Sequence, residues 1–542
     1  MSPRSFPTVS VENRDGTGRI ASMNGYTLPL MVDFLDKEKF EFLQSMDFGM
    51  APYSLNYLDT KRYNILGSKD ENFLVATGLN TLSPKQGVDA LVSLRQKSWN
   101  PLYTPALATP QNIPLLVYMG VDIVDNILPI SEGYKGVYMV SDGQLDVNSL
   151  KELPCNCPTC SSTTAKELKD MELKEKGEQV ALHNTTVLKN QLSLVREHIR
   201  ADNLRNFVEW RTKTDPELTA MLRFADEQHL SGSLFKRSKA LFTTLELNRP
   251  EVTSFFERSI EAYRPQGKTL VILPCTASKP YLKSRTHSAL RKKINFKGLN
   301  EIIISSPLVS PREFELCYPV INYDTTVTGQ WTGDEIGFVA SKLASFISRG
   351  NFEKIIAHVD STYRKIVEEA TTDIDVVYTG ESGILNNSSI ERLKEEIETS
   401  PQTRFSLYRS MFEHMSRYQF GMELDGNYKV KGRYPHLGLY SGRERVMRVD
   451  VRYGMLDIDI PFAQRLLEAD VKTVRIDNFD PKGTVFAAGI LEADSRIRPN
   501  DLVVFYNDNL FGVGLSHMFG KEMVDMHSGY AIKVRRKGKL TD

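Results

Sequence analysis

KTLVILPCTASKPYLKSRTH, residues 268–287, is the stretch of this chain that carries the clearest pattern. Its first eight residues are rich in apolar and β-branched side chains and predict a buried β-strand. The loop that follows holds a thiol, an amine, a phenol, a hydroxyl and an imidazole, on Cys275, Lys279, Tyr281, Ser284 and His287. Pro274 and Pro280 stiffen this loop. A reactive loop at the carboxyl end of a strand indicates a binding or catalytic site.

Further strands are predicted on the C-terminal side of this stretch, at residues 301–306, 353–359 and 374–380, with a helix at 334–350. Strands that alternate with helices favour a mainly parallel sheet covered on both faces. An α/β core domain is therefore placed at residues 250–402. The helix at 386–402 is predicted to be exposed and to act as a linker.

The chain has 542 residues. At roughly 100–200 residues per domain it needs several cores, so the predicted fold class is multidomain α/β. Residues 1–150 suggest a β/α layer or a truncated TIM-like barrel, because a full barrel needs about 250 residues. Within them, 112–128 is predicted to be a strand and then a loop with acidic side chains. The other predicted units are a helical subdomain at 151–249, a small α+β domain at 403–469 and a compact β module at 470–542.

Composition leaves the partner open. Lysine and arginine number 68, as do aspartate and glutamate, and nucleic-acid binding depends on a local basic face rather than on this balance. The absence of an apolar run of 18 residues predicts no transmembrane helix, and residues 1–16 do not resemble a secretory signal. Clustered cysteines favour a metal or catalysis in a reducing cytoplasm over disulfides.

Three of the five cysteines lie close together, as Cys155, Cys157 and Cys160, and His183 opens the helix expected at 183–200. Three thiolates and one imidazole suit tetrahedral zinc and leave no position for water. The sequence therefore predicts a structural Zn²⁺ site. The charged run at 166–178 is expected to be a solvated helix face, and a second helix is expected at 202–213.

The segment LPCNCPTCSS…ELKDMELKEKGEQVALHN resembles the zinc segment of archaeal tRNA-guanine transglycosylases, and NIPLLVYMGVDIVDN resembles the strand that carries their nucleophilic aspartate. The matching position is Asp125. The chain lacks that family's D-S-G-G-F-Q stretch and its glycine-rich base-reading loop, so the resemblance implies a degenerate barrel. It also implies a homodimer formed through the zinc region.

A more specific resemblance rests on the pattern Pro274, Cys275, Lys279, Pro280, Tyr281, Ser284 and His287, with SSPLVSPREFELCYP, YDTTVTGQW and HVDSTYR around it. This pattern is similar to the alpha subunit of archaeosine synthase. The resemblance implies a substrate tRNA that carries 7-cyano-7-deazaguanine at position 15 of its D-loop. The implied reaction joins free lysine, or another nitrogen donor, to the nitrile, and a radical-SAM beta subunit then cleaves the adduct.

Two chemical routes fit the loop. The Cys275 thiolate attacks the nitrile first, or the lysine amine adds directly while His287 or Tyr281 transfers protons. Further acid–base candidates in the same domain are Asp324, Glu335, His358 and Asp360. Two functional alternatives remain, a transglycosylase that inserts the base and a non-catalytic tRNA scaffold for the partner.

Residues 471–540 resemble a PUA domain, a β-barrel that binds RNA. Basic residues here and after the reactive loop are the predicted phosphate contacts. They are Lys283, Arg285, Arg291, Lys292, Arg496, Arg498, Arg535, Arg536 and Lys537.

Overall fold

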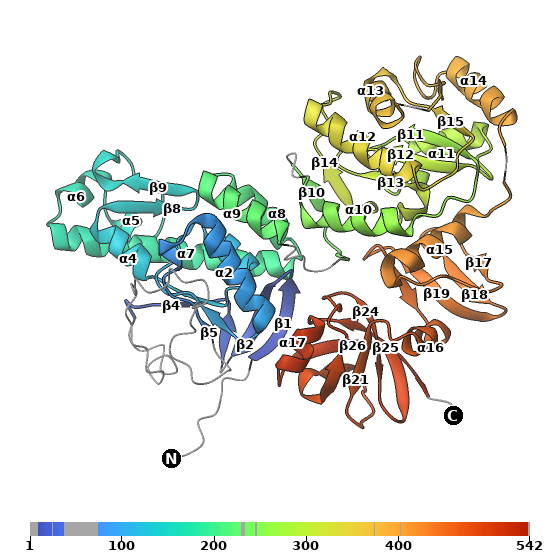
Figure 1. Cartoon of the computed structure of the whole chain (residues 1–542). Helices are drawn as coiled ribbons and strands as arrows, with labels where there is room; N and C mark the ends of the chain where they lie inside the picture. Colours follow the sequence, from blue (N-terminus) through green and yellow to red (C-terminus); the bar gives the residue numbers. More distant parts are fainter. Residues whose placement is uncertain are drawn as a thin grey trace.

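The computed structural model describes residues 9–23, 25–36, 74–228, 234–243, 247–372, 374–401 and 403–539. Figure 1 shows the N-terminal part, the α/β core and the C-terminal modules as successive bodies along the chain. The multidomain α/β fold predicted from the sequence is confirmed. None of the described helices is both long and apolar enough to cross a bilayer.

The N-terminal part contains two sheets. An antiparallel sheet has the order β1-β2-β3 and a parallel sheet the order β4-β7-β6-β5. The strands are β1 (Val9–Asp15), β2 (Gly18–Met23), β3 (Tyr26–Leu28), β4 (Leu30–Val32), β5 (Leu74–Val75), β6 (Leu102–Tyr103) and β7 (Ile123–Asp125), and the helices are α2 (Pro84–Lys97), α3 (Ile113–Tyr118) and α4 (Ile127–Tyr134). A short parallel sheet packed against helices is the layer that the sequence predicted here.

The prediction for residues 112–128 was wrong in its first half, because residues 113–118 form helix α3 and only 123–125 form a strand. Every residue of α3 is buried, so the segment shows no amphipathic period that would separate a helix from a strand. Pro114 occupies the first turn, where a missing N–H costs nothing. The acidic side chains do not project into a loop, since Asp122 and Asp125 are 2% and 0% exposed.

Helices dominate the next segment. Helix α7 begins at Leu173 rather than at residue 183 and runs to Arg200. The charged run at 166–178 spans α6 and the first turns of α7, and most of its charged side chains are exposed, as predicted. The other elements are β8 (Val137–Val140), β9 (Gly143–Asp146), α5 (Pro158–Ser162), α6 (Ala165–Asp170), α8 (Leu204–Thr212) and α9 (Pro216–Glu227).

The α/β core is built on a five-stranded sheet of order β13-β12-β11-β15-β16. Strand β13 is antiparallel, and the other four strands are parallel. The elements are β10 (Ala240–Phe242), α10 (Pro250–Ala262), β11 (Thr269–Pro274), α11 (Arg285–Lys293), β12 (Asn300–Ile304), β13 (Val309–Pro311), β14 (Tyr323–Thr325), α12 (Gly333–Ile347), β15 (Lys354–Ala357), α13 (Ser361–Ala370), β16 (Val376–Tyr378) and α14 (Asn387–Glu398). The strands and the helix expected in this region are confirmed.

Alternate residues of β11 face opposite sides of the sheet. Leu270 and Ile272 pack in the same cluster as α10, α12 and α13, whereas Val271 and Leu273 pack with α11 and α14. Both faces are therefore covered, as expected for parallel strands. The prediction that 386–402 is an exposed linker was wrong, because Ile390, Leu393 and Ile397 of α14 are buried against the sheet.

The C-terminal half ends in two further sheets. The first has the order β17-β18-β19-β20, and the second the order β22-β26-β25-β24-β21-β23. The elements are α15 (Leu407–Phe420), β17 (Lys429–Lys431), β18 (Gly438–Ser441), β19 (Glu444–Asp450), β20 (Met455–Ile458), α16 (Ile460–Glu468), β21 (Thr473–Ile476), β22 (Thr484–Phe486), β23 (Ile490–Ala493), β24 (Leu502–Tyr506), β25 (Leu510–Ser516), α17 (Gly520–Asp525) and β26 (Tyr530–Lys539). One buried cluster runs from the α/β core through α15 and β20 to Val504 and Val513.

Candidate active site and metal centre

The reactive loop leaves the sheet at the carboxyl end of its middle strand. The backbone N–H of Cys275 still donates to the carbonyl of Ile304 on β12 (2.9 Å), so the thiol is held at the last rung of the parallel ladder. Ser305, His358 and Thr379 follow the neighbouring strands at the same edge. Ligands of open parallel sheets collect at this edge, and the half-buried Cys275 places a free thiol there.

Tyr363 lies close to the Cys275 thiol, and Lys279 lies against the ring of Tyr323. The Sγ of Cys275 is 3.6 Å from the hydroxyl of Tyr363 on α13. The Nζ of Lys279 lies 3.8 Å from the ring centroid of Tyr323. Burial lowers the pKa of Lys279, which increases the fraction of free amine, and burial beside Cys275 raises the pKa of Tyr363, so its phenol stays protonated. A thiol, an amine and a neutral O–H donor therefore line one strand end.

An aromatic pair completes this edge, and the sequence analysis did not assign it a role. Trp331 and Tyr363 form an edge-to-face contact with ring centroids 5.3 Å apart, and both are half-buried. Val327, in the loop before Trp331, is 80% exposed. The sequence signals were the stretches YDTTVTGQW, residues 323–331, and HVDSTYR, residues 358–364, and neither has a periodicity that would mark it as a site.

Tyr281 lies beneath the loop rather than on its open side. Its hydroxyl is 2.5 Å from the hydroxyl of Tyr323, which donates to Ser305 Oγ (2.6 Å). Both tyrosines are 1% exposed, and burial raises the pKa of each. Tyr281 therefore anchors the loop to β14 and β12 and is not placed to transfer protons to a substrate.

His287 and Ser284 also face inward. The Nε2–H of His287 donates to the carbonyl of Pro274 (2.9 Å), and its Nδ1 accepts from Arg312 (2.8 Å). Burial, together with the Arg312 charge, lowers the pKa of His287 to about 4. Ser284 is the N-cap of α11 and accepts from the His287 N–H. Both side chains position the loop.

A buried ion network holds this arrangement in place. Arg312 bridges Glu301 (2.7 Å) and Glu315 (2.7 Å), and Glu315 accepts from the N–H of Leu282 in the loop. All three ionised side chains are at most 2% exposed. Removing one partner of such a network typically costs about 3–5 kcal/mol, so the loop is fixed from below.

Replacing His287 with glutamine should separate positioning from proton transfer. The unfolded chain binds the proton at the usual pKa of 6.5 and the folded chain only near 4, so the unfolded state binds more protons between these values and stability falls as pH drops through them. Between pH 7 and 4.5, urea unfolding should show a smaller loss for His287→Gln than for the wild type, by on the order of 2 kcal/mol. At pH 7 the reaction rate should stay within about tenfold of wild type. A loss beyond about 10²-fold with an intact fold would restore the acid–base role.

The additional acid–base candidates are likewise engaged. His358 is 0% exposed, with Thr379 Oγ1 2.9 Å from its Nδ1 and the Ile384 carbonyl 2.8 Å from its Nε2. Asp360 caps α13 through the Thr362 N–H (2.9 Å). Glu335 closes a capping box at α12 and accepts from Ser306 (2.9 Å). Asp324 is exposed and pairs with Lys239. None of these four reaches the thiol through a contact among the described residues.

Asp125 ends β7 but is sealed inside the N-terminal part. Its carboxylate accepts from the Tyr103 hydroxyl (2.7 Å) and from the N–H groups of Ala106 (3.0 Å) and Ile127 (3.0 Å). Burial raises its pKa. The neighbouring Asp33 is occupied by Lys189 (2.6 Å) and Asn126 (2.6 Å). Asp125 therefore has the surroundings of a structural carboxylate.

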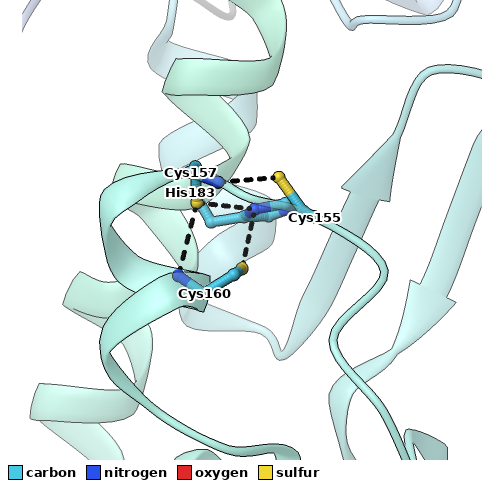
Figure 2. Close-up of side chains that lie close together, drawn as sticks. All are labelled: Cys155, Cys157, Cys160 and His183. Atoms are coloured by element: carbon cyan, nitrogen blue, oxygen red, sulfur yellow. Dashed lines mark hydrogen bonds between the residues drawn. The ribbon is translucent and has the colours of Figure 1, made fainter.

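The predicted metal ligands lie together, as Figure 2 shows. One ligand atom from each of Cys155, Cys157, Cys160 and His183 lies within 4.8 Å of all the others. His183 Nδ1 is 3.4 Å from both the Cys157 and the Cys160 sulfurs. Bond lengths of about 2.0–2.3 Å place tetrahedral ligand atoms some 3.5–3.8 Å apart, so the four residues fit a bound metal ion.

Neighbouring groups orient the histidine ligand. The Nε2–H of His183 donates to the carbonyl of Met139 (2.8 Å), which leaves Nδ1 free for a metal. The Tyr138 ring stacks on His183 with centroids 3.7 Å apart, and its hydroxyl lies 3.0 Å from Cys160 Sγ. Cys157 caps α5, so the sequence around the cysteines sets both the helix start and the ligand geometry.

The predicted RNA contacts fall into two groups. Lys283, Arg285 and Lys292 are exposed at the start and along the outer face of α11. The others pair with protein groups or are partly buried: Arg291 pairs with Glu301, Arg496 with Asp494, Lys537 with Asp480, Arg535 and Arg536 with Asp457, and Arg498 is half-buried.

Comparison with known proteins decides the family. Archaeosine synthase subunit alpha of Methanosarcina acetivorans is 34% identical over 505 residues, which cover 87% of this chain and 80% of the relative. The chain belongs to the archaeosine synthase alpha-subunit family. The archaeosine synthase of Haloferax volcanii is 33% identical over 80% of this chain and 76% of its own length. The tRNA-guanine(15) transglycosylase of Methanosphaera stadtmanae is 24% identical over 83% and 69%.

Domain models divide this archaeosine synthase family member into matched segments. A queuine tRNA-ribosyltransferase model matches residues 80–217, a domain of unknown function 252–397, a pre-PUA domain 405–467 and a PUA domain 480–538. A crystal structure of a protein of unknown function is 52% identical, covers 53% of this chain and 99% of its own, and aligns with a TM-score of 0.47. The Cys275 loop lies within residues 252–397, the segment that matches the domain of unknown function.

Proposed function

We propose that this chain modifies tRNA that carries 7-cyano-7-deazaguanine in its D-loop, by joining the ε-amine of free lysine to the nitrile carbon at the Cys275 loop. Family membership supports an enzyme of tRNA modification. One observation carries the site assignment: at the carboxyl end of the central strand the Cys275 thiol lies 3.6 Å from the Tyr363 hydroxyl, and the Tyr363 ring packs against Trp331.

In the proposed reaction the Cys275 thiolate attacks the nitrile carbon. A C–S bond forms, one C–N π bond breaks and the nitrogen takes a proton, which the Tyr363 hydroxyl is placed to donate. The lysine ε-amine then attacks the same carbon, the C–S bond breaks and the thiolate leaves. The amine gives up one proton, which restores the Tyr363 hydroxyl, so the product is a substituted amidine. Nitrile and amine supply every atom, and the sequence requires no oxidant or reductant.

Lys279 supports the first step in this proposal. Its ammonium form, close to the Tyr323 ring face, favours the thiolate by opposing its charge. The half-buried Trp331 and Tyr363 offer apolar ring surface against which an extruded base can pack.

Two further assignments follow from the same proposal. The cluster of Cys155, Cys157, Cys160 and His183 holds structural Zn²⁺, because four protein ligands leave no open position. The chain contains no C-x-x-x-C-x-x-C motif, so cleavage of the adduct to the formamidine belongs to a radical-SAM partner chain. The buried, three-donor environment of Asp125 supports a scaffold role for the N-terminal part rather than base insertion.

A direct test incubates the full chain with tRNA bearing the nitrile base and isotope-labelled lysine. After nuclease digestion, mass spectrometry should show the modified nucleoside heavier by one intact lysine. Labelled glutamine in a parallel reaction should leave the nucleoside unchanged. Transfer of a nitrogen from glutamine without a lysine adduct, or an unaltered nitrile in both reactions, would overturn the proposal. Insertion of labelled free base into unmodified tRNA would identify a transglycosylase instead.

A further inference from the structure

One stretch of the small domain between the α/β core and the C-terminal module, residues 429–452, is strongly basic, although the whole chain has a formal net charge of zero. Residues 429–452 hold only two acidic residues, Glu444 and Asp450. The basic residues of this stretch are Lys429, Lys431, Arg433, Arg443, Arg445, Arg448 and Arg452. Such a local excess creates a positive field that the overall composition hides.

Three of these residues, Arg445, Arg448 and Arg452, line a groove along β18 and β19, the orange strands beside the C-terminal module in Figure 1. The groove has a volume of about 560 Å³. Gly438 on β18 lies directly opposite Arg448 on β19, and the Tyr440 ring occupies the space beside this glycine. Arg445 and Arg452 line the same groove, as do His436 and Tyr440.

Carboxylates orient the arginines without cancelling their charge. Asp459 binds Arg445 (2.6 Å), Asp457 binds Arg448 (2.9 Å) and Asp450 binds Arg452 (2.9 Å). Asp457 also accepts from Arg535 and Arg536 of β26. Five arginines thus share three aspartates, which leaves an excess of two positive charges.

The groove arginines keep nitrogens available for a ligand. The side chains of Arg445, Arg448 and Arg452 are 36%, 46% and 69% exposed. Arg448 donates only its Nε to Asp457, and within the described part of the chain neither of its terminal nitrogens has a partner. Three guanidinium groups held in fixed positions along an open groove match the repeating charges of a polyanion.

We propose that this groove binds the sugar-phosphate backbone of RNA and forms a second grip on the substrate, separate from the Cys275 loop. Only the identity of the RNA as tRNA rests on the proposed function. Planar guanidinium groups bind phosphate oxygens in pairs, and the exposed side chains of Arg445, Arg448 and Arg452 line the groove. Arg535 and Arg536 of β26 bind Asp457 beside Arg448, so basic residues of both C-terminal modules meet here.

The test measures anisotropy of a labelled, unmodified tRNA transcript across a salt series. The triple variant Arg445→Gln, Arg448→Gln, Arg452→Gln should bind at least about tenfold more weakly. The slope of log affinity against log salt should fall by roughly 2–3, since each lost phosphate contact contributes about 0.7–0.9. The matched control is Arg392→Gln, an exposed arginine on α14, which should bind like the wild type.

Single variants separate a loss of RNA binding from a loss of folding. Arg452→Gln alone removes the most exposed of the three side chains and should lower the slope by about 0.7–0.9 with an unchanged melting temperature. Arg448→Lys keeps the charge but loses the planar fork, so its slope should remain while its affinity drops. Wild-type affinity and slope in the triple variant would overturn the proposal and assign the groove to another ligand, such as an acidic protein.

Failure here is distinguishable from failure of the proposed chemistry. The binding assay needs neither the nitrile nor lysine, whereas the chemistry is read from the adduct. With saturating nitrile-bearing tRNA the triple variant should reach the wild-type kcat and show only a raised KM. If the wild-type chain forms no adduct while its RNA binding still depends on these arginines, that result would support the groove as an RNA-binding site and would overturn the proposed reaction.

Discussion

Replacing Cys275 with alanine should abolish formation of the lysine adduct. The thiol stands at the last rung of the β11 ladder with the Tyr363 hydroxyl 3.6 Å away, and no other sulfur is predicted to act in this domain. Removal of a covalent nucleophile typically lowers kcat by more than about 10³-fold. Mass spectrometry of the digested tRNA measures the adduct. The affinity for tRNA should not change, because Cys275 is not one of the predicted or proposed phosphate contacts.

Two matched variants sharpen this experiment. Cys317 is buried in the same domain, 1% exposed, so Cys317→Ala removes a thiol away from the loop and should retain the rate. Cys275→Ser keeps the shape of the side chain and replaces the thiolate with a poor nucleophile, so it should fail like alanine. If Cys275→Ala reacts at close to the wild-type rate, the lysine amine adds to the nitrile directly and the thiol serves only to pack the loop.

The second large effect is expected at the metal cluster. Cys160→Ser should reduce bound zinc, measured by elemental mass spectrometry, from one equivalent per chain to nearly none. It should also lower the melting temperature by roughly 10 °C or more, because structural zinc supplies much of the folding free energy of small domains. The cluster anchors α5 to α7 and packs with Tyr138 and Leu168, so loss of the metal loosens the whole helical subdomain.

Cys275→Ser is the natural control, since it also removes a thiol but should leave zinc content and melting temperature unchanged. Adduct formation by Cys160→Ser at a temperature where it is folded should persist, because the cluster and the Cys275 loop belong to different domains. A variant that keeps its full zinc content would show that Cys160 is not a ligand. Iron or another metal in the wild-type chain would contradict the zinc assignment.

The α/β core was predictable because its strands are short apolar runs bounded by polar loops, and the residues of β11 and β12 can be buried on both faces only in a parallel sheet. The cysteine spacing likewise predicted the metal cluster, since ligand identity depends on a few side chains near in sequence. Helix α3 was not predicted because it is buried on every side. A fully buried helix has no apolar–polar periodicity, on which such predictions depend.

The roles of individual loop residues could not be predicted in the same way. Cys275 and His287 look alike in sequence, as reactive side chains after a strand, yet one faces the open edge and the other is fixed by Pro274 and Arg312. Arg312 lies 25 residues from His287 in the sequence, and no local sequence pattern predicts that contact. The arginine groove depends in the same way on the strand register that sets Gly438 opposite Arg448.

The apolar interior that links the α/β core to the C-terminal module has a mechanical consequence. Val504 and Val513 belong to the core cluster, while Val474 and Ile532 of the same module pack with Val9 and Val11. A module packed against both neighbouring bodies in this way cannot rotate without exposing hydrocarbon to water. The distance between the Cys275 thiol and the groove arginines is therefore fixed, and the nucleic acid, rather than the protein, must bend to bring its nitrile to the sulfur.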